Sequence, residues 1–179
     1  MDDRSVFHLI SDLTHQEGVP CILIGGFAVN HYNVSRQTAD IDFLITKEDF
    51  GRILNFLERA GYKKDSVQEN FVQLKSNRVS LLDIDFMFVD ADTLKKIMKE
   101  GEPLKIAGQK FVVPSLNHLI ALKLHSIKNN PKLRLSKDFP DIISLIQINK
   151  VDIQGLPFKE LCQKYSTQEI YDRILELVK

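Results

Sequence analysis

One tetrapeptide, Asp-Ile-Asp-Phe, occurs twice in this sequence, at residues 40–43 and 83–86, each time within a mostly apolar segment. The alternation over residues 40–45 is typical of a β-strand, in which successive side chains point to opposite faces. Each copy therefore places its two aspartates on the same face of a strand, roughly 7 Å apart along it. Any fold available to this chain has to accommodate two pairs of carboxylates on two apolar strands.

Paired carboxylates in an apolar strand repel each other, and their removal from water is unfavourable. A bound divalent cation resolves this conflict, and carboxylate oxygens suit Mg²⁺ or Mn²⁺. An Asp-x-Asp pair with a third carboxylate on a neighbouring strand can hold two such ions. The structural alternative is that both strands lie at sheet edges with their aspartates in solvent. Two such pairs in one small chain favour the metal interpretation.

Gly25 and Gly26 directly follow a short apolar run at residues 19–24, which predicts a buried strand that enters a tight turn. Two glycines let the backbone approach a ligand closely, and a short helix predicted after them would direct its N-terminus at a phosphate. A Gly-Gly pair more often marks a plain turn, but its place upstream of the first acidic pair favours a phosphate site. Arg36 and Thr38 lie in the connecting loop and would add a guanidinium and a hydroxyl.

The remaining pattern predicts a mixed α/β core followed by helices alone. Apolar residues at helical spacing predict a first helix over Ser5–His15, and Thr46 is the expected N-cap of a helix that Gly61 ends. Further expected elements are strands at 19–24, 40–45, 71–74 and 79–88, a hairpin at Gly108, and helices at 91–100, 115–129, 137–149 and twice between 157 and 178. We therefore expect an α/β (mixed α+β) fold with a mixed sheet flanked by helices: a core at residues 1–114 and an all-helical extension at 115–179, packed on that core.

The order of these motifs resembles the DNA polymerase β-type nucleotidyltransferase superfamily. Ile24-Gly25-Gly26 is followed by Arg36-x-Thr38-x-Asp40-Ile41-Asp42 and then by a strand with Asp83-Ile84-Asp85. The superfamily's pattern is Gly-Gly or Gly-Ser, a gap, Asp-x-Asp, and a third acidic residue on a later strand. Within it, the sequence is most similar to the small AbiEii-like nucleotidyltransferases, many of them toxins of bacterial toxin–antitoxin or abortive-infection systems. The likeness covers residues 20–90 and continues to residue 148.

The resemblance implies transfer of a nucleotidyl group from a nucleoside triphosphate, such as ATP, to a hydroxyl acceptor. Asp40 and Asp42 would bind two Mg²⁺ (or Mn²⁺) ions, and Gly25 and Gly26 would hold the β- and γ-phosphates. The acceptor stays open between RNA such as tRNA, a protein and a small molecule, and a toxin would have a cognate antitoxin as partner.

The superfamily needs a third carboxylate, and this chain offers two. Asp85 is followed by Phe-Met-Phe and lies more like the family's aspartate ahead of an apolar strand end. We therefore predict Asp85 as the third catalytic and metal-binding carboxylate, with Asp83 as the alternative.

Lys123 lies at the centre of the apolar stripe of the helix expected over 115–129. A lysine in such a stripe either extends its ammonium to solvent or meets an anion. The anion would be the triphosphate, which makes Lys123 a nucleotide-binding candidate, or Asp138 at the start of the next helix.

The charge balance excludes a strong general attraction to nucleic acid or membrane, because Lys plus Arg and Asp plus Glu number 24 each. Seven basic residues and no acidic residue lie between residues 103 and 137. They form either a solvated face or a positively charged surface that binds a polyphosphate or an RNA end. No apolar stretch approaches the ~20 residues that span a bilayer. Cys21 and Cys162 show no ligand-like spacing. We expect a reduced, cytoplasmic protein without a membrane partner.

Two other functions are compatible with the acidic motifs. A nucleotide-sugar glycosyltransferase also binds a metal–diphosphate through Asp-x-Asp, but the short chain and the upstream Gly-Gly argue against it. A degenerate nucleotidyltransferase fold would act as a binding module, which has no need of clustered carboxylates. A metal-dependent nucleotidyltransferase is the leading hypothesis.

Overall fold

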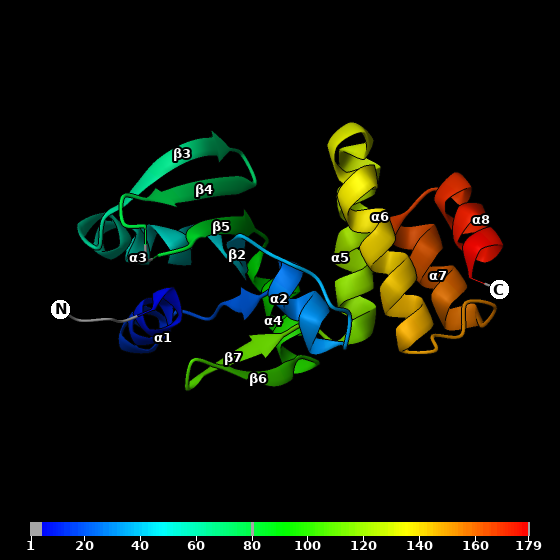
Figure 1. Cartoon of the computed structure of the whole chain (residues 1–179), viewed down its shortest axis with the longest axis horizontal. Coiled ribbons are helices and arrows are strands. Elements are labelled where there is room, and N and C mark those ends of the chain that lie inside the picture. The colour runs from blue at the N-terminus through cyan, green and yellow to red at the C-terminus, as the bar shows by residue number, and fades with distance from the viewer. Residues whose placement is uncertain (1–4, 80, 179) are drawn as a thin grey trace. The chain divides into compact units, whose positions relative to one another are not determined.

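A computed structural model describes residues 5–79 and 81–178 of the chain (Figure 1). Its contacts divide the chain into two compact units. The sheet unit contains the residues up to Ala28 together with Gln37–Ser115, and the helical unit contains Val29–Arg36 together with the residues from Leu116 onward. The segment that precedes Gln37 therefore groups with the C-terminal helices, whereas the predicted division placed it in the core.

A five-stranded mixed sheet forms the centre of the sheet unit (Figure 1). Its strands, in spatial order, are β1 (Ile22–Leu23), β2 (Asp40–Ile45), β5 (Asp83–Phe88), β4 (Phe71–Ser76) and β3 (Tyr62–Gln68). β2 and β5 are parallel, and the other neighbouring pairs are antiparallel. A separate two-stranded ribbon consists of β6 (Glu102–Ile106) and β7 (Gln109–Val113). The predicted fold class, a mixed sheet with flanking helices, is confirmed.

The first four helices are α1 (Val6–Glu17), α2 (Gly25–His31), α3 (Lys47–Arg59) and α4 (Ala91–Lys99). α3 begins where predicted, because the Thr46 side chain accepts a hydrogen bond from the Asp49 amide at 3.1 Å. α3 contacts α1 and β3, and α1 also contacts β7. These contacts cover the apolar side of the central strands.

The alternation of the two central strands determines which side chains enter the core. Ile41 and Phe43 on β2, and Ile84 and Phe86 on β5, are fully buried. The rings of Phe43 and Phe86 stack with their centroids 5.9 Å apart. Because side chains alternate, burial of this apolar face places the aspartates of both strands together on the opposite face.

Three strand predictions need correction. β3 was not expected, because only its first residue, Tyr62, is buried and the rest of the strand carries a polar edge. The strand expected over 79–88 begins at Asp83, and residue 80 lies outside the described residues. The run at 19–24 is likewise a strand only at Ile22–Leu23. An edge strand with few buried side chains lacks the alternating apolar pattern on which strand prediction relies.

The helical unit contains α5 (Leu116–Asn129), α6 (Pro131–Ile148), α7 (Leu156–Tyr165) and α8 (Gln168–Leu177). α5 packs against α6 and α7, and α7 packs against α8 (Figure 1). The helix expected over residues 137–149 begins earlier than predicted, since α6 begins at Pro131. Proline is favoured at the first helical position because that position needs no hydrogen-bonding amide.

Candidate active site

Four aspartates lie on one face of the central strand pair, and we call Asp40, Asp42, Asp83 and Asp85 the acidic cluster. The parallel register places Asp40 directly opposite Asp83 and Asp42 directly opposite Asp85. Neighbouring strands are about 4.8 Å apart, so the register converts two distant motifs into adjacent carboxylates. Asp85 is the most enclosed of the four, with 8% of its surface exposed.

Neutral groups donate hydrogen bonds to three members of the cluster. The Thr38 hydroxyl lies 3.1 Å from Asp40 Oδ1, and Gln73 Nε2 donates to Asp85 Oδ1 at 3.0 Å. Asp83 Oδ1 accepts from the Ser76 backbone amide at 3.0 Å. These donors orient the carboxylates.

The two candidates for the third carboxylate have different surroundings. The Asp83 carboxylate accepts a hydrogen bond from the backbone of β4. Burial of the Tyr62 hydroxyl raises its pKa, and the negative charge of Asp83 raises it further. Asp85 binds a side chain on β4 and lies opposite Asp42 in the register. Asp83 likewise lies opposite Asp40, so both candidates adjoin the first acidic pair. They differ in that Asp83 accepts from the backbone, whereas Asp85 accepts from a side chain and is the more enclosed of the two. Asp85 stays the predicted third carboxylate, with Asp83 as the alternative.

The two glycines lie directly against the acidic cluster and its loop. A Cβ atom on Gly25 would lie 1.8 Å from Asp42 Oδ2, and a Cβ atom on Gly26 would lie 2.8 Å from Thr38 Oγ1. Gly25 also has a φ of 62°, which disfavours other residues. The structure thus brings together the glycine turn, Thr38 and the first acidic pair, which are separated in sequence.

The donor chemistry of the acidic cluster fits a divalent cation. Carboxylate oxygens are the ligands that Mg²⁺ and Mn²⁺ prefer, and Asp42 and Asp85 are direct neighbours across the ladder. Among residues 5–79 and 81–178, no three His, Cys, Asp or Glu side chains lie close enough together to hold a metal ion. Convergence on an ion would require the carboxylates to rotate about their side-chain torsions.

Lys123 lies in the helical unit, where its ammonium contacts two carboxylates. Lys123 Nζ donates to Asp138 Oδ1 at 2.8 Å and to Asp141 Oδ2 at 2.7 Å. All three side chains are buried, with exposed fractions of 7%, 8% and 9%. Of the two anions considered for Lys123, the structure therefore shows Asp138, and it adds Asp141.

Arg36 also contacts this group: its Nη1 lies 3.1 Å from Asp141 Oδ2. Sequence reasoning did not single out Asp141. The available signal was its spacing, because residues three apart on a helix share a face, and Asp138 was already considered as a partner of Lys123. Gln73 was also missed, since a single glutamine on a strand carries no recognisable pattern.

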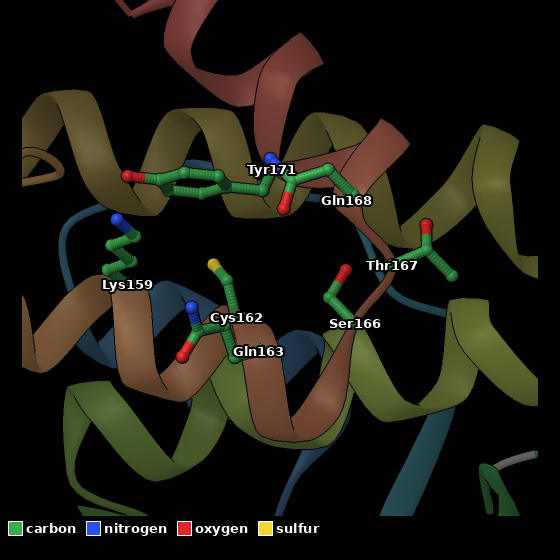
Figure 2. Close-up of a pocket in the computed structure, with 7 residues that line it drawn as sticks. All are labelled: Lys159, Cys162, Gln163, Ser166, Thr167, Gln168 and Tyr171. Atoms are coloured by element: carbon green, nitrogen blue, oxygen red, sulfur yellow. The ribbon is translucent and has the colours of Figure 1, made fainter.

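A cavity of about 180 Å³ lies between α7 and α8, away from every predicted site residue. Figure 2 shows the side chains of Cys162 on α7 and of Ser166, directly after that helix, directed into it, with the Tyr171 ring on the opposite side. The Ser166 hydroxyl is buried and has no hydrogen-bond partner within the described part of the chain. Burial raises the pKa of the Cys162 thiol to about 12, so this cysteine is not an activated nucleophile. An ordered water would satisfy the Ser166 hydroxyl.

The fold and the acidic face define a nucleotidyltransferase-type protein. The sequence matches the model of one family over residues 6–179, and the chain belongs to that family, which is described as uncharacterised nucleotidyltransferase. This agrees with the superfamily expected from the motifs. No curated protein matches the sequence.

Solved structures share the fold at low sequence identity. The antibiotic-resistance factor ANT(2")-Ia, solved in complex with adenylyl-2"-tobramycin, aligns with a TM-score of 0.65 and 15% identity over 89% of this chain and 94% of its own. Lincomycin-bound lincosamide antibiotic adenylyltransferase LnuA aligns with a TM-score of 0.54 and 18% identity, over 79% and 94%. An antigenic nucleotidyltransferase-like protein from Paracoccidioides brasiliensis aligns with a TM-score of 0.56 and 16% identity over 96% of this chain and 91% of its own. These likenesses establish the fold.

Within residues 5–79 and 81–178, none of the helices has the length and apolar character needed to cross a membrane. Both cysteines are free thiols.

Proposed function

We propose that this protein is a metal-dependent nucleotidyltransferase that moves a nucleoside monophosphate group from a nucleoside triphosphate to a hydroxyl acceptor. The parallel register of β2 and β5, which pairs Asp42 with Asp85, is the observation that carries this proposal. Membership of a nucleotidyltransferase family supports it. The register matters because two strand segments more than forty residues apart form one acidic surface only in this alignment.

Asp40, Asp42 and Asp85 are the proposed metal ligands, with Mg²⁺ or Mn²⁺ as the ion. A divalent cation bound by them would oppose the charge of the triphosphate and lower the pKa of the acceptor hydroxyl. The proposal of two ions follows from the resemblance to the polymerase β-type superfamily. The close approach of Gly25 to Asp42 supports a site in which backbone amides and carboxylates act on the same substrate.

The proposed nucleotide-binding residues are Gly25, Gly26, Thr38 and Arg36. The glycine amides would hold the β- and γ-phosphates, since the absence of a side chain lets phosphate oxygens approach the backbone. The Thr38 hydroxyl already orients Asp40 and lies against Gly26, so it connects the phosphate and carboxylate parts of the site. Lys123 was predicted as a further phosphate ligand, but its contacts with Asp138 and Asp141 support a structural role.

The proposed reaction is an in-line displacement at the α-phosphorus. The acceptor oxygen forms a bond to the α-phosphorus while the bond from that phosphorus to the β-bridging oxygen breaks, and pyrophosphate leaves. The proton of the acceptor hydroxyl passes to a carboxylate of the acidic cluster. The chain's own residues thus align the phosphates and receive the proton.

RNA, protein and small-molecule acceptors are all compatible with this reaction. Two structural neighbours, ANT(2")-Ia with an adenylyl-tobramycin and LnuA with lincomycin, contain small-molecule ligands and support that class of acceptor. The sequence likeness to AbiEii-like proteins instead supports a toxin that modifies RNA or protein and has a cognate antitoxin.

A second candidate function is a nucleotide-binding module that has lost catalysis. The observation in its favour is that no three of the described acidic, histidine or cysteine side chains converge on a metal position. Such a module would bind a triphosphate and transfer nothing.

Transfer of the α-phosphate distinguishes these functions. The wild-type protein is incubated with Mg²⁺, total cell extract and each of the four nucleoside triphosphates labelled at the α-phosphorus. The matched control variant is Asp42→Asn, and a parallel reaction uses the label at the γ-phosphorus. A nucleotidyltransferase labels an acceptor from the α-position only, and Asp42→Asn does not.

Label that enters an acceptor from the γ-position would identify a phosphotransferase and overturn the proposal. Triphosphate binding without transfer from any nucleotide would support the binding module. Fractionation of the labelled material into RNA, protein and small molecules then identifies the acceptor class.

A further inference from the structure

Four charged side chains, three of them buried, form a continuous network in the helical unit, and we call Lys123, Asp138, Asp141 and Arg36 the charge network. Asp141 is the shared member, because its Oδ2 contacts both Lys123 Nζ at 2.7 Å and Arg36 Nη1 at 3.1 Å. Lys123 also holds Asp138, whereas the contact of Arg36 is with Asp141 alone among the ion pairs of the described chain. The network joins α5, α6 and the segment at residues 29–36.

The charges in this network balance two against two. Lys123 and Asp138 form one complete pair, both at most 8% exposed. The negative charge of Asp141 is therefore the counter-charge of Arg36 as well as a second partner for Lys123. Two carboxylates for a single buried lysine would leave an uncompensated charge, which is costly in a low-dielectric environment. Arg36 is thus required for the balance.

Arg36 is more exposed than the other three members. Its side chain is 31% exposed, whereas that of Asp141 is 9% exposed. The contact with Asp141 involves one nitrogen, Nη1, of a planar group that carries five N–H donors. A guanidinium anchored by one nitrogen can present other donors to a phosphate in a fixed orientation.

The backbone at Arg36 is held as well. Asn30 Nδ2 donates to the Arg36 carbonyl oxygen at 2.9 Å, and the Arg36 amide donates to Asn30 Oδ1 at 2.8 Å. Arg36 precedes Thr38 by two residues and Asp40 by four, so the chain itself keeps it within about 14 Å of Asp40. Both the side chain and the main chain of Arg36 are therefore held within the helical unit, at a position two residues before Thr38 in the sequence.

We infer that Asp141 is a positioning residue: it holds the Arg36 guanidinium in the orientation that binds the triphosphate. The inference rests on the proposed function, because it assumes a triphosphate substrate. It adds a residue that no motif indicated, and it gives the buried carboxylate a role beyond neutralising Lys123. Asp138 is the natural comparison, since it contacts the same lysine but not Arg36.

The test measures equilibrium binding of nucleotides in the presence of Mg²⁺. The probes are the triphosphate that the wild-type protein binds most tightly and the corresponding monophosphate. Asp141→Asn should weaken triphosphate binding roughly tenfold, the effect of losing one charge-assisted hydrogen bond, and leave monophosphate binding unchanged. Arg36→Gln should do the same, and the double variant should be no weaker than Arg36→Gln alone, because both changes remove one interaction.

Two further variants separate positioning from structure. Asp138→Asn is the matched control, which removes a carboxylate from Lys123 and should leave the ratio of triphosphate to monophosphate affinity unchanged. Arg36→Lys keeps the positive charge beside Asp141 but has a single nitrogen, so it should lose triphosphate affinity while the protein stays folded. Because Arg36 is partly exposed, Arg36→Lys still tests the inference if Asp141→Asn fails to fold.

Each outcome decides the inference. Wild-type triphosphate affinity in Asp141→Asn or Arg36→Lys would overturn it, as would an equal loss for both nucleotides or the same triphosphate-specific loss in Asp138→Asn. A wild-type protein that binds no triphosphate would overturn the proposed function first, and the inference with it.

Discussion

Aspartates in the two units contact donors of different kinds. In the helical unit, Asp138 and Asp141 contact the cationic side chains of Lys123 and Arg36 at 2.7–3.1 Å. In the sheet unit, the hydrogen-bond donors to Asp40, Asp83 and Asp85 include a hydroxyl, a backbone amide and a carboxamide.

The difference bears on which carboxylates we propose to be catalytic. A carboxylate paired with a buried lysine or arginine is neutralised within the chain, and its charge is part of the fold. The carboxylates of the acidic cluster neighbour one another across a ladder, and like charges this close repel each other. A divalent cation would relieve this repulsion, so we propose that the reaction takes place at the acidic cluster.

The largest effect is expected at Asp42, a proposed metal ligand that lies directly opposite Asp85 in the register. Asp42→Asn, like Asp40→Asn, should abolish nucleotidyl transfer, a loss of more than about 10³-fold in rate. The unfolding temperature should stay the same or rise, because the change removes charge from a repulsive cluster. Label transfer from the α-phosphate and a thermal melt measure the two quantities. Full activity in either variant would refute the nucleotidyltransferase proposal.

The second prediction compares the two candidates for the third carboxylate. Asp85→Asn should lower the transfer rate by about 10³-fold, since it removes a charge-stabilising group beside Asp42. Asp83→Asn should lower the rate much less and should instead destabilise the sheet, because Asp83 Oδ1 accepts from the Ser76 amide of β4. Rates and unfolding free energies of both variants check this, and the reverse ranking of rates would assign the role to Asp83.

How much of this site was predictable depends on whether its residues form a local pattern. The Asp-Ile-Asp-Phe repeats predicted two strands with acidic faces, and Gly25-Gly26 was placed upstream of the first pair. What no local pattern could show was the register, because the parallel pairing of β2 and β5 depends on β4 and β3 being inserted beyond β5. The register is what makes Asp85 the neighbour of Asp42.

In the helical unit, the sequence predicted part of the charge network but not all of its contacts. A lysine in the centre of an apolar stripe signalled a buried cation, and Asp138 was among its expected partners. Asp141 was missed although it lies three residues after Asp138 on the same helix, because its contact with Lys123 joins α6 to α5 and no pattern within one helix shows such a contact. The long-range contact of Arg36 was invisible for the same reason, as it joins residues more than a hundred positions apart.

The third prediction tests the structural role of Lys123 in the helical unit. Lys123→Met keeps the apolar stem and removes the charge that two buried carboxylates share, so it should lower the free energy of unfolding by about 3 kcal/mol or more. Addition of Asp138→Asn to that variant should restore part of the loss, because one uncompensated charge is removed. Lys75→Met, which breaks the exposed pair with Asp65, is the control and should have little effect. Chemical denaturation measures all of these, and a stable Lys123→Met variant with weakened nucleotide binding would instead support the triphosphate role.

The smallest effect, and the most direct test of where an external cation binds, is a shift of stability with divalent ions. Mg²⁺ or Mn²⁺ at ten times its dissociation constant should stabilise the chelator-treated wild-type protein by about 1.4 kcal/mol, because an ion that binds only the folded state shifts the equilibrium by mass action. Asp42→Asn should lose this shift, since it removes a proposed ligand. Asp138→Asn should keep it, because its carboxylate is already neutralised by Lys123. Thermal melts at several ion concentrations provide the measurement. An equal shift in the wild-type protein and in Asp42→Asn would place the ion away from the acidic cluster, and a shift lost in Asp138→Asn alone would place it in the helical unit.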